Sequence, residues 1–370
     1  MDAQRLKENF AQVAQHGDAV ALFFYSDLFL RNPQLRNMFP VGMSHQRDRL
    51  LAALGRIVSQ VDNLHDLVPF VQQLGRDHRK FGVEALHYPE VGASLVTTLR
   101  YFSGRAWTEE LARDWTDAYN LVAKVMLDAA QEDAATHPSW WNAQVVAHER
   151  RRFDLAVMRV LPDRPFAYQP GQAVSLEVPA RLRMWRYYSP ANAPRPDNTL
   201  DLHVQLIDGG PVSPVLVRSL NVGDWIKLGP PVGTMTLDER PGRDVLLIGG
   251  STGLAPLKAI LEQIAARPNP PRVHLFFGAR YIDGLYDLED LQKRSAGAPW
   301  LTVIPVVSDH DPGPAAEHGT LADVIGRFGQ WQNHDAYVCG SPGMTDATVG
   351  RLLQFGLSQD RIRIDKYADA

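Results

Sequence analysis

The chain has 370 residues, of which 45% are hydrophobic and 22% charged, with a formal net charge of -4. This length and composition predict two or three packed domains, exclude wholesale disorder and give no support to nucleic-acid binding. Cys339 is the only cysteine, which excludes an intramolecular disulfide and indicates a reducing compartment. The first residues are polar and no run of about 18 apolar residues occurs, so we expect a cytoplasmic protein without stable membrane association.

Residues 1–137 are predicted to form an all-α domain. They hold only 4 of the 26 prolines and 7 of the 28 glycines, the residues that most often interrupt helices. Apolar residues recur there at helical spacing, for example at Leu67, Val71 and Leu74, and no alternating strand pattern occurs. We therefore expect helix to follow helix up to residue 137.

Residues 138–240 have a different pattern, in which short alternating apolar runs are separated by turn-forming stretches rich in proline, glycine and asparagine. The runs lie at 147–160, 172–178, 200–207 and 224–228. Short strands at this spacing are typical of an antiparallel sheet that closes into a small barrel or packs as a sandwich. We expect an antiparallel β-barrel domain here.

Residues 241–370 alternate between apolar runs and amphipathic helical stretches. This order predicts a doubly wound α/β domain, in which helices cover both faces of a parallel sheet. The whole chain is therefore expected to be multi-domain, with an all-α, an antiparallel β-barrel and an α/β domain in series.

A glycine-rich turn follows the first predicted strand of the last segment. The apolar residues 245–248 run into the stretch 249–256, GGSTGLAP, after which a helix begins. Glycines let a backbone approach a pyrophosphate, Pro256 suits a first helical turn, and the helix start offers free amides to an anion. A tight turn without a nucleotide is the alternative. The residues predicted to bind the nucleotide are Gly250, Ser251, Thr252, Gly253, Leu254, Ala255 and Pro256.

A second glycine turn, in the stretch 337–344, again comes at the end of an apolar run. Ligands of open α/β sheets bind at the carboxyl ends of the strands, so Cys339 and Gly340 are candidates for contact with a nicotinamide ring. A small buried thiol that only fills space is the alternative for Cys339. Both residues mark the expected nucleotide-binding edge.

The middle segment holds a candidate flavin motif, Arg186-Tyr187-Tyr188-Ser189, before a proline-rich loop. Arginine pairs with phosphate, a tyrosine ring covers an isoalloxazine face, and a serine hydroxyl bonds the reactive flavin nitrogen. An exposed strand rich in arginine and tyrosine is the alternative. Further on, Ser213 is predicted as a helix N-cap that receives an anion.

These motifs resemble the ferredoxin-reductase-like family, in which a flavin barrel precedes a nicotinamide domain. The resemblance covers about residues 145–370 and rests on Arg-x-Tyr-Ser, the glycine turn and Cys-Gly-x-x-Gly-Met, together with Pro170-Gly171-Gln172 and the terminal strand. It implies FAD and NAD(P)H as cofactors and places Gln172, Arg186 and Ser189 beside the flavin, with Tyr187 and Tyr188 in the same motif.

His78 stands out among the histidines of the helical segment. It lies four residues after Leu74 and seven after Val71, on the apolar stripe of a helix whose adjacent residues are charged. An inward-facing imidazole is either a core residue or a metal ligand. Tyr25 and Gln46 also stand at the head of apolar stripes, where a core tyrosine and a helix-surface glutamine are the alternatives.

The stretches FFYSDLFLRNPQLRNMFP, HQRDRLLAALGRIV and LGRDHRKFGVEALHY resemble the globin domain of the flavohaemoglobins, and with the reductase segment the whole chain matches that family. The resemblance implies a haem b, non-covalent because no Cys-x-x-Cys-His sequence is present, with His78 as the proximal iron ligand. The other residues it implies are Phe39 packed on the porphyrin, Tyr25, Gln46 and Leu50 in the distal pocket, and Tyr88 in the proximal hydrogen-bond network.

Two departures from the family pattern concern the site. The glutamate that completes the proximal network falls at Ala130, and the nearest carboxylate, Glu132, lies about 200° around an ideal helix. The chain also ends in KYADA and not in the usual Phe-Gly-Pro, although Tyr367 has a ring that would cover the flavin.

The reaction of the family is nitric oxide dioxygenation, in which NO and O₂ give nitrate at a haem that NAD(P)H re-reduces through FAD. The resemblance implies an oxidoreductase whose partners are these small molecules. An O₂ or redox sensor, and a reductase with a quinone or alkyl hydroperoxide as acceptor, are the alternatives. Arg280 would pair with a 2′-phosphate, whereas Asp283 or Asp287 would accept a ribose hydroxyl, and likeness to oxygenase reductases favours NADH.

Overall fold

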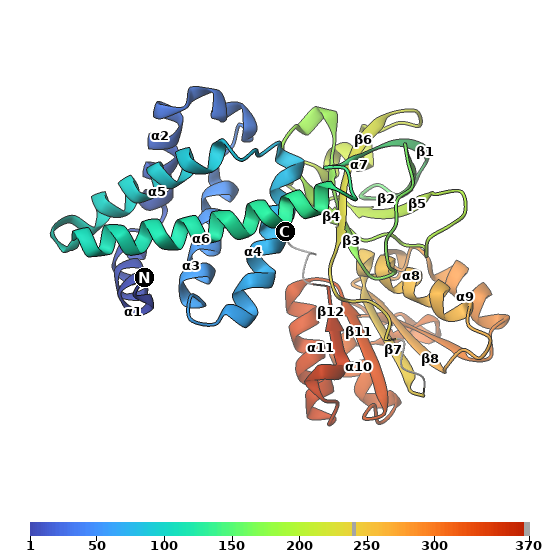
Figure 1. Ribbon diagram of the computed structural model, residues 1–370. Helices are drawn as coiled ribbons and strands as arrows, with labels where there is room; N and C mark the ends of the chain where they lie inside the picture. Colours follow the sequence, from blue (N-terminus) through green and yellow to red (C-terminus); the bar gives the residue numbers. More distant parts are fainter. Residues whose placement is uncertain (239–241, 366–370) are drawn as a thin grey trace. The chain divides into compact units, whose positions relative to one another are not determined.

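The structure is a computed structural model that describes residues 1–238 and 242–365. It divides into two compact units, Met1–Ser139 and Trp140–Ala370 (Figure 1). None of the helices in these described ranges is long and apolar enough to cross a membrane.

The first unit is helical throughout, as its sequence predicts. Two of its helices begin at capping side chains, because Asp2 accepts a hydrogen bond from the Arg5 amide and Thr108 accepts one from the Leu111 amide. The helices are α1 (Ala3–Ala14), α2 (Asp18–Arg31), α3 (Ser44–Ser59), α4 (Leu64–His78), α5 (His87–Ser103) and α6 (Glu109–Ala134), with the 3₁₀ turns η1 (Pro33–Met38), η2 (Arg79–Phe81) and η3 (Gly104–Ala106).

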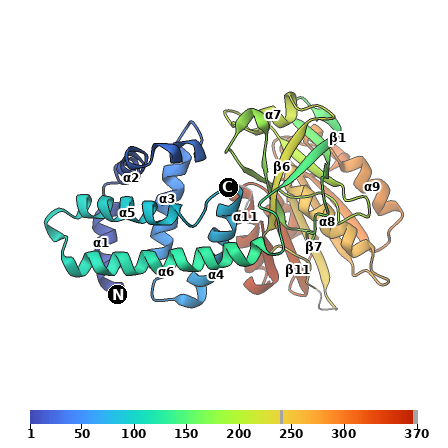
Figure 2. The same ribbon diagram turned by 45° about the horizontal axis from the view of Figure 1, so that its top comes forward.

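Helices α4 and α6 lie against each other (Figure 2). A Cβ atom at Gly75 of α4 would lie 2.3 Å from the carbonyl oxygen of Met126 in α6, so glycine is required for this close approach. Helices α5 and α6 also approach closely, since a Cβ atom at Gly92 would lie 2.5 Å from the Tyr119 ring. These crossings place the last turn of α4, which ends at His78, beside α6.

The second unit contains a six-stranded antiparallel sheet in the strand order β4-β3-β6-β1-β2-β5, as the sequence predicts. Its buried side chains form one apolar core together with the short helix α7 (Ser213–Arg218). The strands are β1 (Trp141–Arg152), β2 (Leu155–Pro162), β3 (Ala173–Glu177), β4 (Arg186–Tyr188), β5 (Leu200–Gln205) and β6 (Trp225–Val232), with the 3₁₀ turn η4 (Pro179–Arg181) after β3.

One predicted strand is wrong. The run 147–160 is a hairpin in which β1 and β2 pair antiparallel, with Phe153 and Asp154 at the turn. The pattern concealed this turn because the pair Phe153-Asp154 contains neither glycine nor asparagine, the residues that mark tight hairpins in a sequence.

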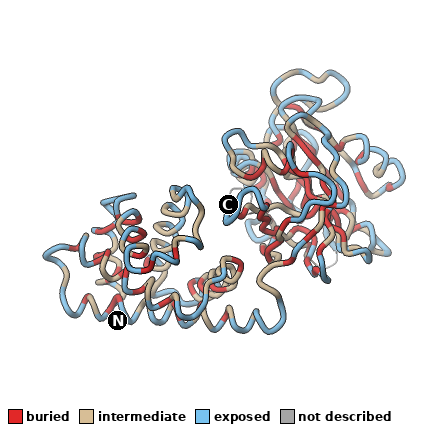
Figure 3. Tube along the Cα trace, turned by 90° about the horizontal axis from the view of Figure 1, so that it is seen from above, coloured by how far each residue is buried: buried red, intermediate tan, exposed pale blue. Residues whose placement is uncertain are grey.

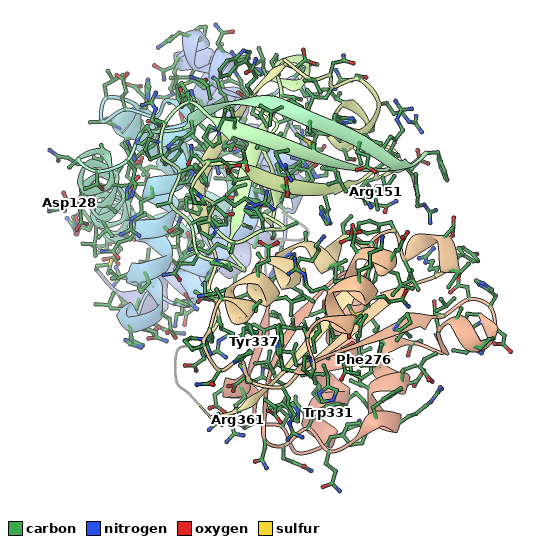
Figure 4. All side chains as sticks on the ribbon, turned by 90° about the vertical axis from the view of Figure 1, so that its right-hand side faces the viewer. Asp128, Arg151, Phe276, Trp331, Tyr337 and Arg361 are labelled. Carbon is green, nitrogen blue, oxygen red and sulfur yellow. The ribbon has the colours of Figure 1, made fainter. Side chains whose placement is uncertain are left out.

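The same unit contains a six-stranded parallel sheet in the order β10-β9-β8-β7-β11-β12. Neighbouring residues Phe276 and Phe277 of β8 point to opposite faces: Phe277 packs in one core with Tyr337, α8 and α9, and Phe276 packs in the other with Trp331, α10 and α11 (Figure 4). Buried residues run along the strands between these helices (Figure 3). The sheet is therefore doubly wound, as predicted.

The elements of this parallel sheet alternate regularly along the chain. They are β7 (Asp244–Gly250), η5 (Ser251–Gly253), α8 (Leu254–Ala265), β8 (Val273–Ala279), η6 (Ile282–Gly284), α9 (Leu288–Ala296), β9 (Leu301–Val307), η7 (Gly313–Ala315), β10 (Glu317–His318), α10 (Leu321–Phe328), β11 (His334–Cys339), α11 (Pro342–Gln354), η8 (Gln359–Arg361) and β12 (Ile362–Ile364).

Candidate functional site

His78 is the last residue of α4, and one ring nitrogen is already engaged. Its Nδ1 atom lies 2.6 Å from the carbonyl oxygen of Leu74, one turn earlier in the same helix. This contact fixes Nδ1 as the protonated nitrogen and leaves Nε2 as the one with a free lone pair. Burial lowers the pKa of the imidazole, so the ring is neutral at pH 7. A neutral imidazole whose other nitrogen donates to a carbonyl is the form that binds metal.

Tyr25 of α2 forms a second part of the site. Its side chain is buried, with 6% of its surface exposed, and its ring lies edge-on to Phe39 at 5.4 Å. The Tyr25 hydroxyl donates a long hydrogen bond of 3.4 Å to the carbonyl oxygen of Gln46. Burial raises the pKa of Tyr25 to about 12, so the phenol keeps its proton as a hydrogen-bond donor.

The structure brings Tyr25, Phe39 and Leu50 into one apolar cluster. Gln46 reaches this cluster through its backbone, whereas the glutamine residue itself is half-buried near the start of α3. The fold thus places the Tyr25 hydroxyl at the first turn of α3, close to the other residues that the resemblance assigns to a distal pocket.

Apolar side chains on α3 and α4 remain half-exposed within the helical unit. Only Val58 is buried among the sixteen residues of α3, although Leu50, Leu54 and Ile57 of that helix are apolar. On α4, Leu74 is half-buried one turn before His78. A flat apolar group between these helices would cover them and would meet the free Nε2, so the residues present fit a haem.

The proximal network is incomplete in this chain. Tyr88 of α5 is buried beside Val71, and its carbonyl oxygen accepts a hydrogen bond of 2.5 Å from the Tyr119 hydroxyl. Ala130 is half-buried, while Glu132 lies exposed on α6. Glu132, the nearest carboxylate in the sequence, therefore does not complete the network, because a rotation of about 200° from Ala130 turns it to solvent.

In the second unit, two residues far apart in the sequence, Ser189 and Cys339, contact the carboxylate of a third, Asp365. The Ser189 hydroxyl donates a hydrogen bond of 2.9 Å to Oδ2 of Asp365, and the Cys339 thiol lies 3.8 Å from the same oxygen. Asp365 is not among the residues predicted from the sequence. One signal would have found it, since Asp365 directly follows β12, the strand beside β11, and carboxyl ends of parallel strands form the ligand edge.

The remaining flavin candidates lie on or near β4. Arg186 and Tyr187 lie on this strand with Tyr188, whose ring packs against the apolar core of the sheet, and burial raises the pKa of Tyr188. The Arg186 guanidinium donates a hydrogen bond of 2.8 Å to the carbonyl oxygen of Trp185. Gln172 closes the turn before β3, where its side-chain oxygen accepts a hydrogen bond of 2.8 Å from the Gln169 amide.

The prediction that Ser213 is a helix N-cap is wrong. Ser213 is the first residue of α7, Val212 occupies the N-cap position, and no side-chain cap is formed. The Ser213 hydroxyl instead accepts a hydrogen bond of 2.9 Å from the Ile207 amide. The buried hydroxyl is thus used to close the loop before α7.

The two glycine turns touch each other. A Cβ atom at Gly253 would lie 2.3 Å from the carbonyl oxygen of Cys339, and one at Gly340 would lie 2.1 Å from the Met344 side chain. Ser251 takes a left-handed backbone conformation, with φ of 51°, and its hydroxyl donates to Gln205 at 3.2 Å. The other residues of the predicted nucleotide turn are Gly250 at the end of β7, Thr252 in η5, and Leu254, Ala255 and Pro256 in the first turn of α8.

The carboxylates weighed for a ribose contact are already engaged. Asp287 is buried and forms an ion pair with Lys258, so its expected contact with a ribose hydroxyl is not supported. Asp283 forms an ion pair of 3.1 Å with Arg152. Arg280 is exposed just after β8. Tyr367, expected to cover the flavin, lies outside the described residues.

Comparisons with known proteins match all three segments. Residues 22–126 match the globin family model, residues 141–237 the oxidoreductase FAD-binding domain and residues 247–350 the oxidoreductase NAD-binding domain.

Full-length relatives include the flavohemoprotein of Bordetella parapertussis, which is 28% identical over 95% of this chain and 94% of its own length. The ferredoxin–NAD(P)⁺ reductase component of the naphthalene 1,2-dioxygenase system of Pseudomonas putida is 32% identical over 65% of this chain and 71% of its own length. A solved flavohemoglobin from Malassezia yamatoensis with bound FAD and heme has the same fold, with a TM-score of 0.82 and 17% identity, and the match covers 99% of this chain and 98% of that one.

The fold and the site define an oxidoreductase in which a haem-binding globin is fused to a flavin and nicotinamide nucleotide reductase. Its cofactors are haem, FAD and NAD(P)H. Along nearly its whole length the chain is similar to the flavohaemoglobins, which combine the same three domains.

Proposed function

We propose that this chain is a nitric oxide dioxygenase that uses NAD(P)H to turn NO and O₂ into nitrate. Two molecules of NO, two of O₂ and one NADH give two nitrate ions, NAD⁺ and one proton. The observation that carries the proposal is the pairing of a free His78 Nε2 with a buried, protonated Tyr25 hydroxyl in a globin that is fused to its own reductase.

When bound, haem would supply the iron at which NO and O₂ react, and FAD would supply the electron path from the nicotinamide. His78 would bind the iron through Nε2, and Phe39 and Leu50 would pack against the porphyrin. The Tyr25 hydroxyl would hold its proton at Oη and donate a hydrogen bond to a polar diatomic ligand, with Gln46 next to it. Storage of O₂ needs no reductase, so the fused reductase supports turnover.

In the second unit, different residues would bind different parts of the two nucleotide cofactors. Ser189 and Asp365 would hold a hydrogen bond beside the flavin, with the Cys339 thiol next to the same carboxylate. Arg186 would pair with an FAD phosphate, and the amides at the start of α8 would receive the nucleotide pyrophosphate. The functional division at residues 1–137, 138–240 and 241–370 and the cytoplasmic location stay predictions.

Measurement of nitrate formed per NADH consumed, with NO and O₂ supplied to the purified holoprotein, tests the proposal. We expect two nitrate ions per NADH and a rate that vanishes in His78→Ala. NADH oxidation that yields no nitrate, and that persists in His78→Ala with a quinone or an alkyl hydroperoxide present, would instead identify a reductase with another acceptor.

A further inference from the structure

The residue next to His78 ties the end of α4 to α6. The Arg79 guanidinium forms an ion pair with the Asp133 carboxylate, and the two side chains are only 11% and 12% exposed. A second guanidinium nitrogen donates a hydrogen bond of 2.7 Å to the carbonyl oxygen of His137. The other Asp133 oxygen lies 3.1 Å from Nδ1 of His137. Arg79, Asp133 and His137 therefore form a closed ring of polar contacts.

Asp133 lies on the same side of α6 as Ala130. Residues three apart face the same way on a helix, whereas Glu132 is turned outward and exposed. The Asp133 carboxylate therefore lies about one helical turn after Ala130, the position that faces the proximal network. The Asp133 carboxylate pairs with the Arg79 guanidinium beside His78 and not with Tyr88. The Tyr88 hydroxyl has no hydrogen-bond partner within the helical unit, all of which the structure describes.

A second constraint acts on the same turn of α4. Gly75 packs against the Met126 backbone, where a Cβ atom would lie 2.3 Å from the carbonyl oxygen. His78 stands between this close crossing and the Arg79 ion pair, and its ring rotation is set by the Nδ1 contact with Leu74. The position of Nε2 thus depends on how α4 is fastened to α6.

We propose that Arg79 and Asp133 are positioning residues for the haem ligand His78. The ion pair fixes the position of the imidazole by holding the end of α4 against α6. It takes the place of a carboxylate and a tyrosine that would form a hydrogen-bond network with the imidazole N–H. The His78 imidazole then keeps a neutral form, hydrogen-bonded to the Leu74 carbonyl alone. This inference rests on His78 as the iron ligand and does not depend on the reaction that the haem performs.

The iron–histidine stretching band in the resonance Raman spectrum of the ferrous full-length protein tests this directly. We expect Asp133→Asn and Arg79→Gln each to lower the band frequency and to raise the haem dissociation rate about 10- to 100-fold, the usual cost of losing a residue that orients a metal ligand. Arg79→Lys keeps the charge and should restore much of the wild-type band. Tyr88→Phe should leave the band in place, because its hydroxyl does not hold the imidazole.

Asp128→Asn is the matched control, because Asp128 lies on the same helix and pairs with Lys124 at 2.7 Å but is 62% exposed (Figure 4). It should leave both measurements unchanged. Wild-type bands in Asp133→Asn and Arg79→Gln would overturn the proposal. So would a shift of the band in Tyr88→Phe, a variant that decides the question even if the ion-pair variants do not fold. A wild-type protein without an iron–histidine band would show that His78 is not the ligand, whereas missing nitrate formation would overturn only the proposed reaction.

Discussion

The Ser189 hydroxyl donates a hydrogen bond of 2.9 Å to the Asp365 carboxylate, across 176 residues of sequence. Ser189 follows a strand of the antiparallel sheet, and Asp365 follows the edge strand β12 of the parallel sheet. The bond therefore joins the predicted flavin motif to the nucleotide-binding edge, with the Cys339 thiol 3.8 Å from the same oxygen. A carboxylate at this junction is well placed to orient the serine hydroxyl toward a flavin.

Asp365→Asn should slow the reduction of FAD by NADH roughly tenfold to hundredfold, which corresponds to the loss of a hydrogen bond to a charged group. FAD content should stay normal, since no phosphate partner is removed. Stopped-flow reduction of the flavin measures the rate, and Ser189→Ala should give a similar decrease. Asp360→Asn, a change at an exposed carboxylate nearby in the sequence, is the control. A normal reduction rate in Asp365→Asn would show that the carboxylate does not act through Ser189.

His78→Ala should abolish the Soret band of the bound haem and leave the flavin spectrum intact, because the iron loses its only protein ligand while the reductase is untouched. Absorption spectra of the reduced and oxidised protein report both cofactors. His65→Ala, at an exposed position of the same helix, should keep the Soret band. An unchanged ferrous spectrum in His78→Ala would assign the iron to another histidine.

Tyr25→Phe should raise the O₂ dissociation rate about tenfold to hundredfold, because a hydrogen bond to a polarised ligand is worth roughly 1–3 kcal/mol. The phenol is the donor only while protonated, and burial raises the pKa of Tyr25 to about 12. The wild-type dissociation rate should therefore be flat with pH up to about 10, the ordinary tyrosine value. Laser photolysis measures the rate, and an unchanged rate in Tyr25→Phe would make Gln46 the better candidate.

Ionisation of Tyr25 also contributes to the loss of stability in alkali. The pKa is raised in the folded protein, so the contribution of the buried phenol is complete below the unfolded pKa of about 10 and is lost as pH rises through about 12. Urea unfolding across this interval should show a steeper loss of stability for the wild type than for Tyr25→Phe. Equal slopes would mean that the phenol is solvated in the folded state.

Much of the fold could be predicted because it depends on local patterns. The helices of residues 1–137 follow from periodicity and the scarcity of proline, and the glycine turn at 249–256 follows from its place after an apolar strand. The hairpin at Phe153 could not be located, since neither glycine nor asparagine marks it. The sequence pattern puts the N-cap at Ser213 and the structure puts it at Val212, because adjacent positions both suit a helix start and only the hydrogen bond from the Ile207 amide distinguishes them.

The site was harder to predict where it depends on contacts between distant segments. Asp365 is a candidate site residue because it contacts Ser189 and Cys339, and only the folded sheets bring these three residues together. Glu132 lies outside the network for a local reason that the sequence already shows, because helical geometry alone directs it away from the side that Ala130 occupies. The position of Asp287 in the sequence suits a contact with a ribose hydroxyl. Its burial against Lys258 results from tertiary packing, so the local sequence could not predict it.

NADH should be preferred over NADPH, and Arg280→Ala should weaken both cofactors alike. Arg280 is exposed just after β8, where it would stack on the adenine or meet the pyrophosphate that both nucleotides carry. The engaged state of Asp287 removes one acidic residue that would repel a 2′-phosphate, so the expected preference for NADH rests on Asp283, which is paired with Arg152. The ratio of kcat/KM for NADH and NADPH, measured by flavin reduction, decides the matter. Arg272→Ala is the control, because Arg272 directly precedes β8 at the end opposite to Arg280. It should leave kcat/KM for both nucleotides unchanged. A wild-type preference for NADPH that disappears in Arg280→Ala would show instead that the guanidinium pairs with the 2′-phosphate.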